Sequence, residues 1–289
     1  MGIIRQEVYE VLLKSFPLSY LEEWDNAGLL IGTLSLPVKK IVVALEPALD
    51  TIEFAAKYEA DILITHHPLI FKPLKNLSDE LLHKKLSLFY QNSITYISLH
   101  TNLDKSEYGL NRYVASLLNL KSVVPLFEKR EKEKNQKDFW KDVNILNKIF
   151  NLTKERDSIE PSLGVKGVLA EPVKFVEFVN ILKEKLKITG SVRVINKPDD
   201  DYMVRKVSIC TGAGGGLITK LDKNCGVYIT GDITYHNAIY ACEKGIIAID
   251  AGHYYTENVC TDLLEKFLKE RFDSIEIKKY QGRIPWQEV

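Results

Sequence analysis

Short apolar runs of strand length alternate along the chain with segments of helical periodicity, and this alternation is the strongest constraint on the fold. The helical segments are 3–16, 50–58, 81–92, 108–118 and 173–186; the apolar runs are 28–32, 39–46, 62–64, 94–99, 164–169, 192–195, 207–210, 227–230 and 246–249. Strands and helices in this order predict an α/β protein with substantial parallel pairing. A chain of 289 residues is long enough for one large domain or two ordinary ones.

The two halves of the sequence resemble each other at the residues that follow their strands. In each half a late strand ends at a histidine that has a carboxylate four residues further on. The two pairs are His100 with Asp104 and His253 with Glu257. We interpret this echo as an ancient duplication.

The echo predicts two similar α/β lobes with mixed sheets flanked by helices, 1–125 and 126–289. Because α/β sheets place their ligands at the carboxyl ends of strands, we expect the metal site at strand ends between the lobes. The segment 128–157 mixes both charge signs, which is typical of a solvated helical face or surface loop.

The strand 62–64 runs directly into a pair of neighbouring histidines, His66 and His67, and Pro68 then interrupts regular structure. Four of the six histidines stand just after predicted strands, beside carboxylates, whereas His83 and His236 are expected at the surface. The candidate metal ligands are His66, His67, Asp104, His253 and Glu257, with His100 close by.

Imidazole and carboxylate ligands suit zinc, iron, manganese, cobalt or nickel. Five ligands are too many for one tetrahedral site with an open position, but they fit two divalent ions that share a bridging carboxylate, for which we favour Glu257. Such a pair, roughly 3.5–4 Å apart, can hold and deprotonate a water for hydrolysis. The alternative is that these side chains have a structural role, or that they orient other ligands without binding metal themselves.

The charge balance favours no polyanionic partner. Lysine plus arginine equals aspartate plus glutamate at 39 each, so the net charge gives no electrostatic reason to expect binding to nucleic acid or an anionic membrane, although a local basic patch would not alter this balance. No signal peptide or membrane-spanning run is evident, and we expect a cytoplasmic protein. The four cysteines lack Cys-x-x-Cys spacing and are interpreted as buried, reduced thiols.

The glycine-rich stretch 212–216 follows a predicted strand, but Leu217 stands where a dinucleotide fingerprint has its third glycine. We therefore expect a tight turn, or a close approach of the backbone to another group, rather than a phosphate-binding loop.

These motifs together resemble the GTP cyclohydrolase I type 2 homolog family, the Nif-three-like proteins with dinuclear metal centres. The matching segments are 24–29, 64–71, 100–104, 212–215, 231–232 and 252–257, which span nearly the whole chain. One departure is Glu46, at a position where the resemblance leads us to expect an aspartate.

The resemblance implies two α/β lobes, a toroidal homohexamer and two metal ions per chain. By motif position, His67 and Asp104 would hold one ion and His66 and His253 the other, with Glu257 as the bridge.

Two classes of function follow from these features. The first is a metal-dependent hydrolase that acts on a nucleotide such as GTP, by ring-opening chemistry or on a phosphoester, with His100 as the proton shuttle. The second is a non-catalytic metal-binding scaffold or regulatory interaction protein.

Overall fold

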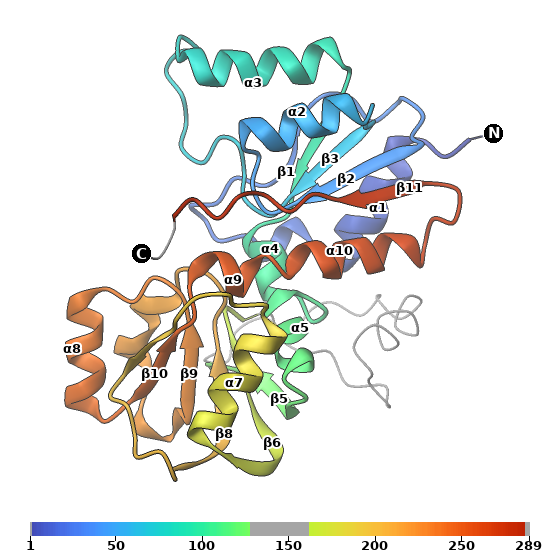
Figure 1. The fold of residues 1–289 in the computed structure, drawn as a ribbon. Coiled ribbons are helices and arrows are strands. Elements are labelled where there is room, and N and C mark those ends of the chain that lie inside the picture. The colour runs from blue at the N-terminus through green and yellow to red at the C-terminus, as the bar shows by residue number, and fades with distance from the viewer. Residues whose placement is uncertain (1, 128–161, 287–289) are drawn as a thin grey trace. The chain divides into compact units, whose positions relative to one another are not determined.

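The computed structural model describes residues 2–127 and 162–286, which form two compact units, each built on its own sheet (Figure 1). The first unit takes 2–108 and 260–285 from these residues, and the second takes 109–127, 162–259 and Trp286. The α/β fold with two helix-flanked sheets is as predicted. The boundary expected at residue 125 differs from this division, and the charged segment 128–157 lies outside the described residues.

The first unit has a five-stranded sheet in the order β1-β4-β3-β2-β11. β1 pairs antiparallel with β4, and the other neighbouring strands pair in parallel. Its elements are α1 (Arg5–Ser15), a 3-10 helix (Leu18–Tyr20), β1 (Gly28–Ile31), β2 (Lys40–Ala44), α2 (Leu49–Lys57), β3 (Ile62–Thr65), α3 (Glu80–Gln91), β4 (Thr95–Ser98), α4 (Thr101–Lys105), α10 (Cys260–Lys269) and β11 (Glu276–Lys279).

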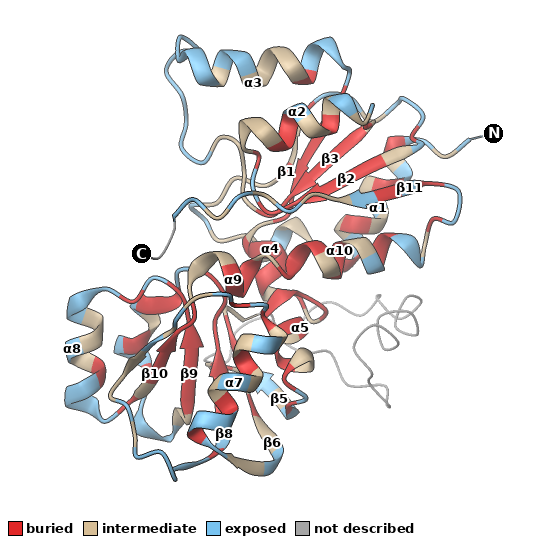
Figure 2. Ribbon diagram, viewed as in Figure 1, coloured by how far each residue is buried: buried red, intermediate tan, exposed pale blue. Residues whose placement is uncertain are grey.

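The central strands of this sheet are apolar on both faces because helices cover both sides, and Figure 2 shows them as buried. On one face, Val42, Leu63 and Tyr96 pack with Ile52 of α2 and Phe89 of α3. On the other face lie α1 and α10 (Figure 1), where the rings of Phe16 and Phe267 are 5.0 Å apart.

The C-terminal segment joins the first unit through β11 and α10. β11 pairs in parallel with β2, and α10 packs on both of these strands. Our division at residue 125 placed this segment in the second lobe because β11 is short and only its Ile277 is buried, so it gives no continuous apolar run.

The second unit has a six-stranded sheet in the order β5-β6-β8-β9-β10-β7. β8, β9 and β10 run parallel, whereas β5, β6 and β7 pair antiparallel with their neighbours. Its elements are α5 (Leu110–Leu117), β5 (Lys121–Pro125), β6 (Val165–Lys174), α7 (Phe175–Lys185), β7 (Arg193–Ile195), β8 (Met203–Ile209), 3-10 helices (Gly214–Lys220 and Lys223–Cys225), β9 (Val227–Thr230), α8 (Tyr235–Lys244), β10 (Ile247–Asp250) and α9 (His253–Glu257).

The two sheets share an order of strands. In each unit three successive strands lie side by side in parallel, β2-β3-β4 in one and β8-β9-β10 in the other. In each, an earlier strand then pairs antiparallel with the third, β1 with β4 and β7 with β10. The echo seen in the sequence is therefore present in the topology, and it fixes which strand ends correspond.

Among the described residues, no helix combines the length and the apolar character needed to cross a membrane. All four cysteines have free thiols, as expected. Cys210 and Cys260 are buried, but Cys242 is exposed and Cys225 half-buried, so the prediction that all four are buried is wrong.

Candidate metal centre

The first unit brings three of the predicted histidines together at the carboxyl ends of β3 and β4. His66 and His67 follow β3, and His100 follows β4. One ring nitrogen from each lies within 4.8 Å of the other two. The ring centroids are 5.1 Å apart for His66 with His67, 5.1 Å for His66 with His100 and 5.4 Å for His67 with His100. Neighbouring parallel strands thus gather three imidazoles at one edge of the sheet.

Asp104 joins this histidine cluster from the short helix α4, which begins directly after His100. Its Oδ1 lies 3.8 Å from Nε2 of His66, and both side chains are buried. A buried carboxylate is tolerated where a cationic or metal partner offsets its desolvation. The first unit therefore supplies three imidazoles and one carboxylate.

In each histidine of the cluster, Nδ1 forms a hydrogen bond with an oxygen atom of the protein. Nδ1 of His66 is 2.8 Å from the carbonyl oxygen of Leu99, and Nδ1 of His67 is 2.5 Å from Oε1 of Glu46. Nδ1 of His100 is 2.7 Å from Oδ1 of Asp25. Since these oxygens accept, each Nδ1 carries the proton, and Nε2 is left to act as a ligand or base.

Asp25 is the most strongly held of these partners. Its side chain is fully buried and accepts hydrogen bonds from the backbone N–H of Thr101 at 3.1 Å and from its hydroxyl at 2.5 Å, besides His100. Burial raises the pKa of Asp25, but the hydrogen bonds from His100 and Thr101 outweigh burial and lower the pKa to about 2. Asp25 is therefore an anion at neutral pH, and it fixes the orientation of His100.

The backbone of the histidine pair is held by three buried hydroxyls. Ser98 donates to the carbonyl oxygen of His66 at 2.8 Å, and Thr65 and Tyr96 donate to that of His67 at 2.6 and 2.9 Å. Burial raises the pKa of Tyr96, so its hydroxyl stays protonated and able to donate. These bonds fix the corner at which the two imidazoles diverge.

The second unit places the other two predicted ligands on the short helix α9. His253 and Glu257 stand four residues apart, and Nε2 of His253 lies 2.8 Å from Oε2 of Glu257. Nδ1 of His253 is 2.7 Å from Oδ2 of Asp232, which follows β9. This histidine therefore also has its Nδ1 held by a carboxylate, and Glu257 is buried.

Two glycines make room for this second donor pair. A Cβ at Gly212 would collide with the carboxylate of Glu257, and Gly212 also has a positive φ of 67°. A Cβ at Gly231 would lie 2.6 Å from the backbone nitrogen of His253. The prediction of a close backbone approach at the stretch 212–216 is confirmed, and the approached group is a predicted metal ligand.

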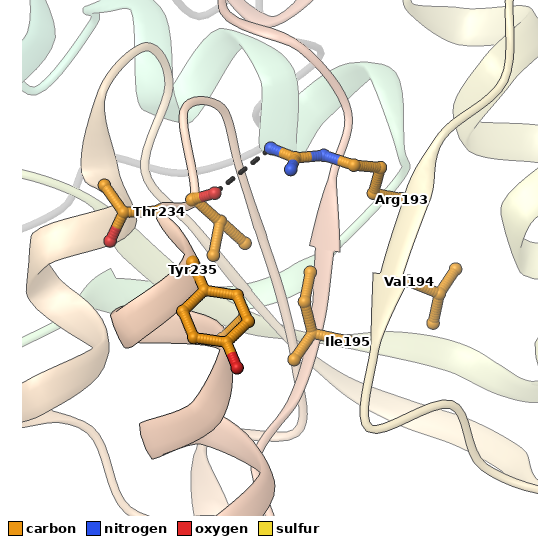
Figure 3. A pocket seen from close by; sticks show the side chains of 7 residues that line it. Arg193, Val194, Ile195, Thr234 and Tyr235 are labelled. Carbon is orange, nitrogen blue, oxygen red and sulfur yellow. Dashed lines mark hydrogen bonds between the residues drawn. The ribbon is translucent and has the colours of Figure 1, made fainter.

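A cavity of about 460 Å³ lies elsewhere in the second unit, between β7 and the start of α8 (Figure 3). Arg193 lines it and donates to the carbonyl oxygen of Ile233 at 3.1 Å, and also to the carboxylate of Asp250. That buried carboxylate accepts from the backbone N–H groups of Ile233 at 3.0 Å and Gly252 at 3.1 Å. These bonds stabilise the loops that carry Asp232 and His253.

The donors in both units fit divalent metal ions by their chemistry. They are imidazoles that present Nε2 and carboxylates that are largely buried, which is a donor set for zinc, iron, manganese, cobalt or nickel. His83 and His236 are exposed, as predicted for histidines outside the site.

Our sequence analysis assigned no role to Asp25. The signal was there, since Asp25 lies in the segment 24–29 that carries part of the family resemblance. Glu46 and Asp232 were noticed by position, but only the structure shows that they hold His67 and His253.

The fold and the site define a class of α/β protein in which imidazole and carboxylate groups at the ends of strands can bind metal. The sequence model of the family Duf34/NIF3 (NGG1p interacting factor 3) matches residues 3–283, and the chain belongs to this family.

Curated relatives cover nearly the whole chain. A protein of Methanocaldococcus jannaschii named "GTP cyclohydrolase 1 type 2 homolog" is 30% identical over 271 residues, which cover 93% of this chain and 96% of the relative. The "GTP cyclohydrolase 1 type 2" of Helicobacter pylori strain J99 is 32% identical over 272 residues, with 92% and 93% covered.

Solved structures agree with the fold. "Reduced HcgD from Methanocaldococcus jannaschii" has a TM-score of 0.75 at 30% identity, with 96% of this chain and 98% of that chain covered. "Crystal structure of Staphylococcus aureus protein SA1388" has a TM-score of 0.82 at 25% identity, with 99% of both chains covered.

Proposed function

We propose that this chain binds two divalent metal ions through donors from both units. His67 and Asp104 would hold one ion, His66 and His253 would hold the other, and Glu257 would be shared between them. The observation that carries the proposal is the shared arrangement of His66, His67, His100 and His253, each with its Nδ1 against an accepting oxygen. This arrangement is typical of metal-binding histidines.

The number of donors favours one centre that draws on both units. His253 and Glu257 supply two ligands, fewer than the three protein ligands of a typical catalytic zinc site. The histidine cluster and Asp104 supply the remainder. The pairing of ligands with ions follows from the family resemblance.

When bound, the divalent ions would supply Lewis-acid activation of a water and would offset the negative charge that develops during hydrolysis. The protein's own residues bind and orient the ions. Asp25 holds the proton on Nδ1 of His100, so that Nε2 of His100 can accept or return a proton at the substrate.

We further propose that the chain is a hydrolase that acts on a nucleotide, because curated relatives are named GTP cyclohydrolase 1 type 2 or a homolog of it. Attack on the purine ring and attack on a phosphoester both suit this donor set. From the family resemblance of the sequence motifs we also propose a toroidal homohexamer, and we propose that it acts in the cytoplasm.

A non-catalytic metal-binding scaffold is the second candidate. The family description names an interacting factor, which favours a role in binding a protein partner. The two candidates differ in one property, because the enzyme requires turnover that depends on the metal.

The test is an assay with GTP on the protein as purified, after chelation, and after reconstitution with each candidate metal. Chromatography of the nucleotide detects ring opening, and a phosphate assay detects phosphoester cleavage. We expect turnover that chelation abolishes and metal restores. The variant His100→Gln should lose most of kcat while keeping its metal. Protein that holds two ions per chain and turns over nothing would favour the scaffold.

A further inference from the structure

Two large aromatic side chains of the first unit are exposed beside the histidine cluster. Trp24, in the loop before β1, is 56% exposed, and Phe71, in the loop after β3, is 43% exposed. Their ring centroids lie 5.6 Å apart, with an angle of 56° between the planes. Exposed neighbouring aromatic rings often mark a surface that binds a ligand or partner.

Both rings meet His100 with perpendicular geometry. The Trp24 centroid is 6.1 Å from that of His100 at an angle of 74°, and the Phe71 centroid is 6.2 Å away at 80°. His100 also lies against the rings of His66 and His67. The aromatic pair therefore borders the same three imidazoles that we propose for metal binding and proton transfer.

Hydrogen bonds fix the loops that carry the two rings. The side-chain amide of Asn26 donates to the carbonyl oxygen of Ile70 at 2.5 Å, which joins the residues next to Trp24 and Phe71. Asp25 is held in turn by His100 and Thr101. The rings are thus ordered before any ligand arrives, so that binding costs little conformational entropy.

We propose that Trp24 and Phe71 form a subsite for a planar aromatic ring, and that this subsite holds the heterocyclic part of the substrate against the histidine cluster. The inference rests on the proposed function and extends it. A flat ring gains dispersion and stacking energy on an aromatic surface whatever its substituents, whereas a phosphate gains nothing from Trp24 or Phe71. The ring, rather than the phosphates, then faces the proton-transfer residue His100.

The test is calorimetric titration of the full-length, metal-loaded protein with guanosine, adenosine and inorganic triphosphate, with the metal content measured for each variant. We expect both nucleosides to bind, and Trp24→Leu and Phe71→Leu each to weaken nucleoside binding roughly tenfold or more. Triphosphate binding and metal content should stay unchanged. Trp24→Phe, which keeps a ring, should bind nearly as well as the wild type.

Tyr90→Leu is the matched control, because Tyr90 is another exposed aromatic residue of the first unit, on α3, and its loss should change nothing. Nucleoside binding that is absent in the wild type, or unchanged in both leucine variants, would overturn the proposal. So would leucine variants that change the oligomeric state in light scattering and leave nucleoside binding intact. Nucleoside binding by protein that holds no metal would leave the aromatic subsite standing while the proposed metal centre fails.

Discussion

The two units position their candidate metal ligands by different means. Both put histidines and carboxylates after the second and third of three parallel strands. In the first unit, polar side chains hold the corners, with three hydroxyls on the backbone of His66 and His67 and a buried Asp25 behind His100. In the second, glycines make room, and Gly212 lies against Glu257.

The difference reflects the ligands that each unit positions. The first unit orients three imidazoles towards one another at the ends of two strands, which requires many hydrogen bonds. The second must bury one glutamate beside one histidine, which requires space next to the backbone. Substitutions that add volume beside the backbone should therefore act mainly in the second unit, whereas the loss of one hydrogen bond should have a similar effect in either unit.

The largest effect is expected at Gly212. Gly212→Ala adds a Cβ that collides with Glu257 and forces an alanine into a positive φ, so we expect a loss of about 2–4 kcal/mol in the free energy of unfolding. Urea unfolding measures it. Gly216→Ala is the matched control, because a Cβ at Gly216 meets no atom within 4 Å. Equal free energies of unfolding for the two variants would show that the close packing of Glu257 against Gly212 does not limit the residue at this position.

The carboxylates behind His67 and His253 should matter about equally for metal affinity. Glu46→Gln and Asp232→Asn each leave a neutral acceptor at Nδ1, and loss of such a partner weakens metal binding by roughly 10- to 100-fold. Asp232 has a positive φ of 55°, which asparagine also tolerates. Competition with a chelator measures the affinity, with Glu59→Gln as the exposed control. If Glu46→Gln and Asp232→Asn bind metal as tightly as the control variant, these two carboxylates do not contribute to metal binding.

Asp25→Asn should lower the free energy of unfolding by about 2 kcal/mol at neutral pH, because the pKa of Asp25 falls from 3.8 to about 2 on folding. A carboxylate with a lowered folded pKa stabilises the protein above its unfolded pKa, and this contribution is lost as the pH falls through its folded pKa. The stability gap between wild type and variant should therefore narrow from pH 4 towards pH 2.

Denaturant unfolding at several pH values measures this gap, and Asp273→Asn, at an exposed carboxylate, is the control. A gap that does not depend on pH would show that Asp25 is not held as an anion.

The smallest effects are expected at two buried tyrosine hydroxyls, one in each unit. Tyr96 donates to the carbonyl oxygen of His67, and Tyr228 donates to that of Gly214 at 2.8 Å. Tyr96→Phe and Tyr228→Phe should each cost about 1 kcal/mol in the free energy of unfolding. The exposed Tyr90→Phe should cost almost nothing. A large difference between the losses at Tyr96 and Tyr228 would contradict the expectation that single hydrogen bonds contribute about equally in the two units.

The fold was largely predictable because strands buried on both faces leave continuous apolar runs, such as 62–64 and 227–230. The strand β11 was not predicted because its residues are mostly charged, and its pairing with β2 joins residues more than 200 positions apart. Local patterns carry no information about such pairings.

The candidate ligands were predictable because histidines and carboxylates stand together after strands, and their spacing is local. Asp25 could not be assigned, since it is 75 positions from His100 and a turn needs the same residue type. The role of Gly212 likewise depends on the packing of Glu257 against it, which is visible only in three dimensions.

The most direct test of the account is the amount of metal per chain, measured by elemental analysis on protein purified without chelator. The wild type should hold close to two ions. Asp104→Asn and Glu257→Gln, one from each unit, should both lose metal clearly while remaining folded by circular dichroism. A folded wild type that holds no metal even after reconstitution, or full metal content in both variants, would contradict a centre built from donors of both units.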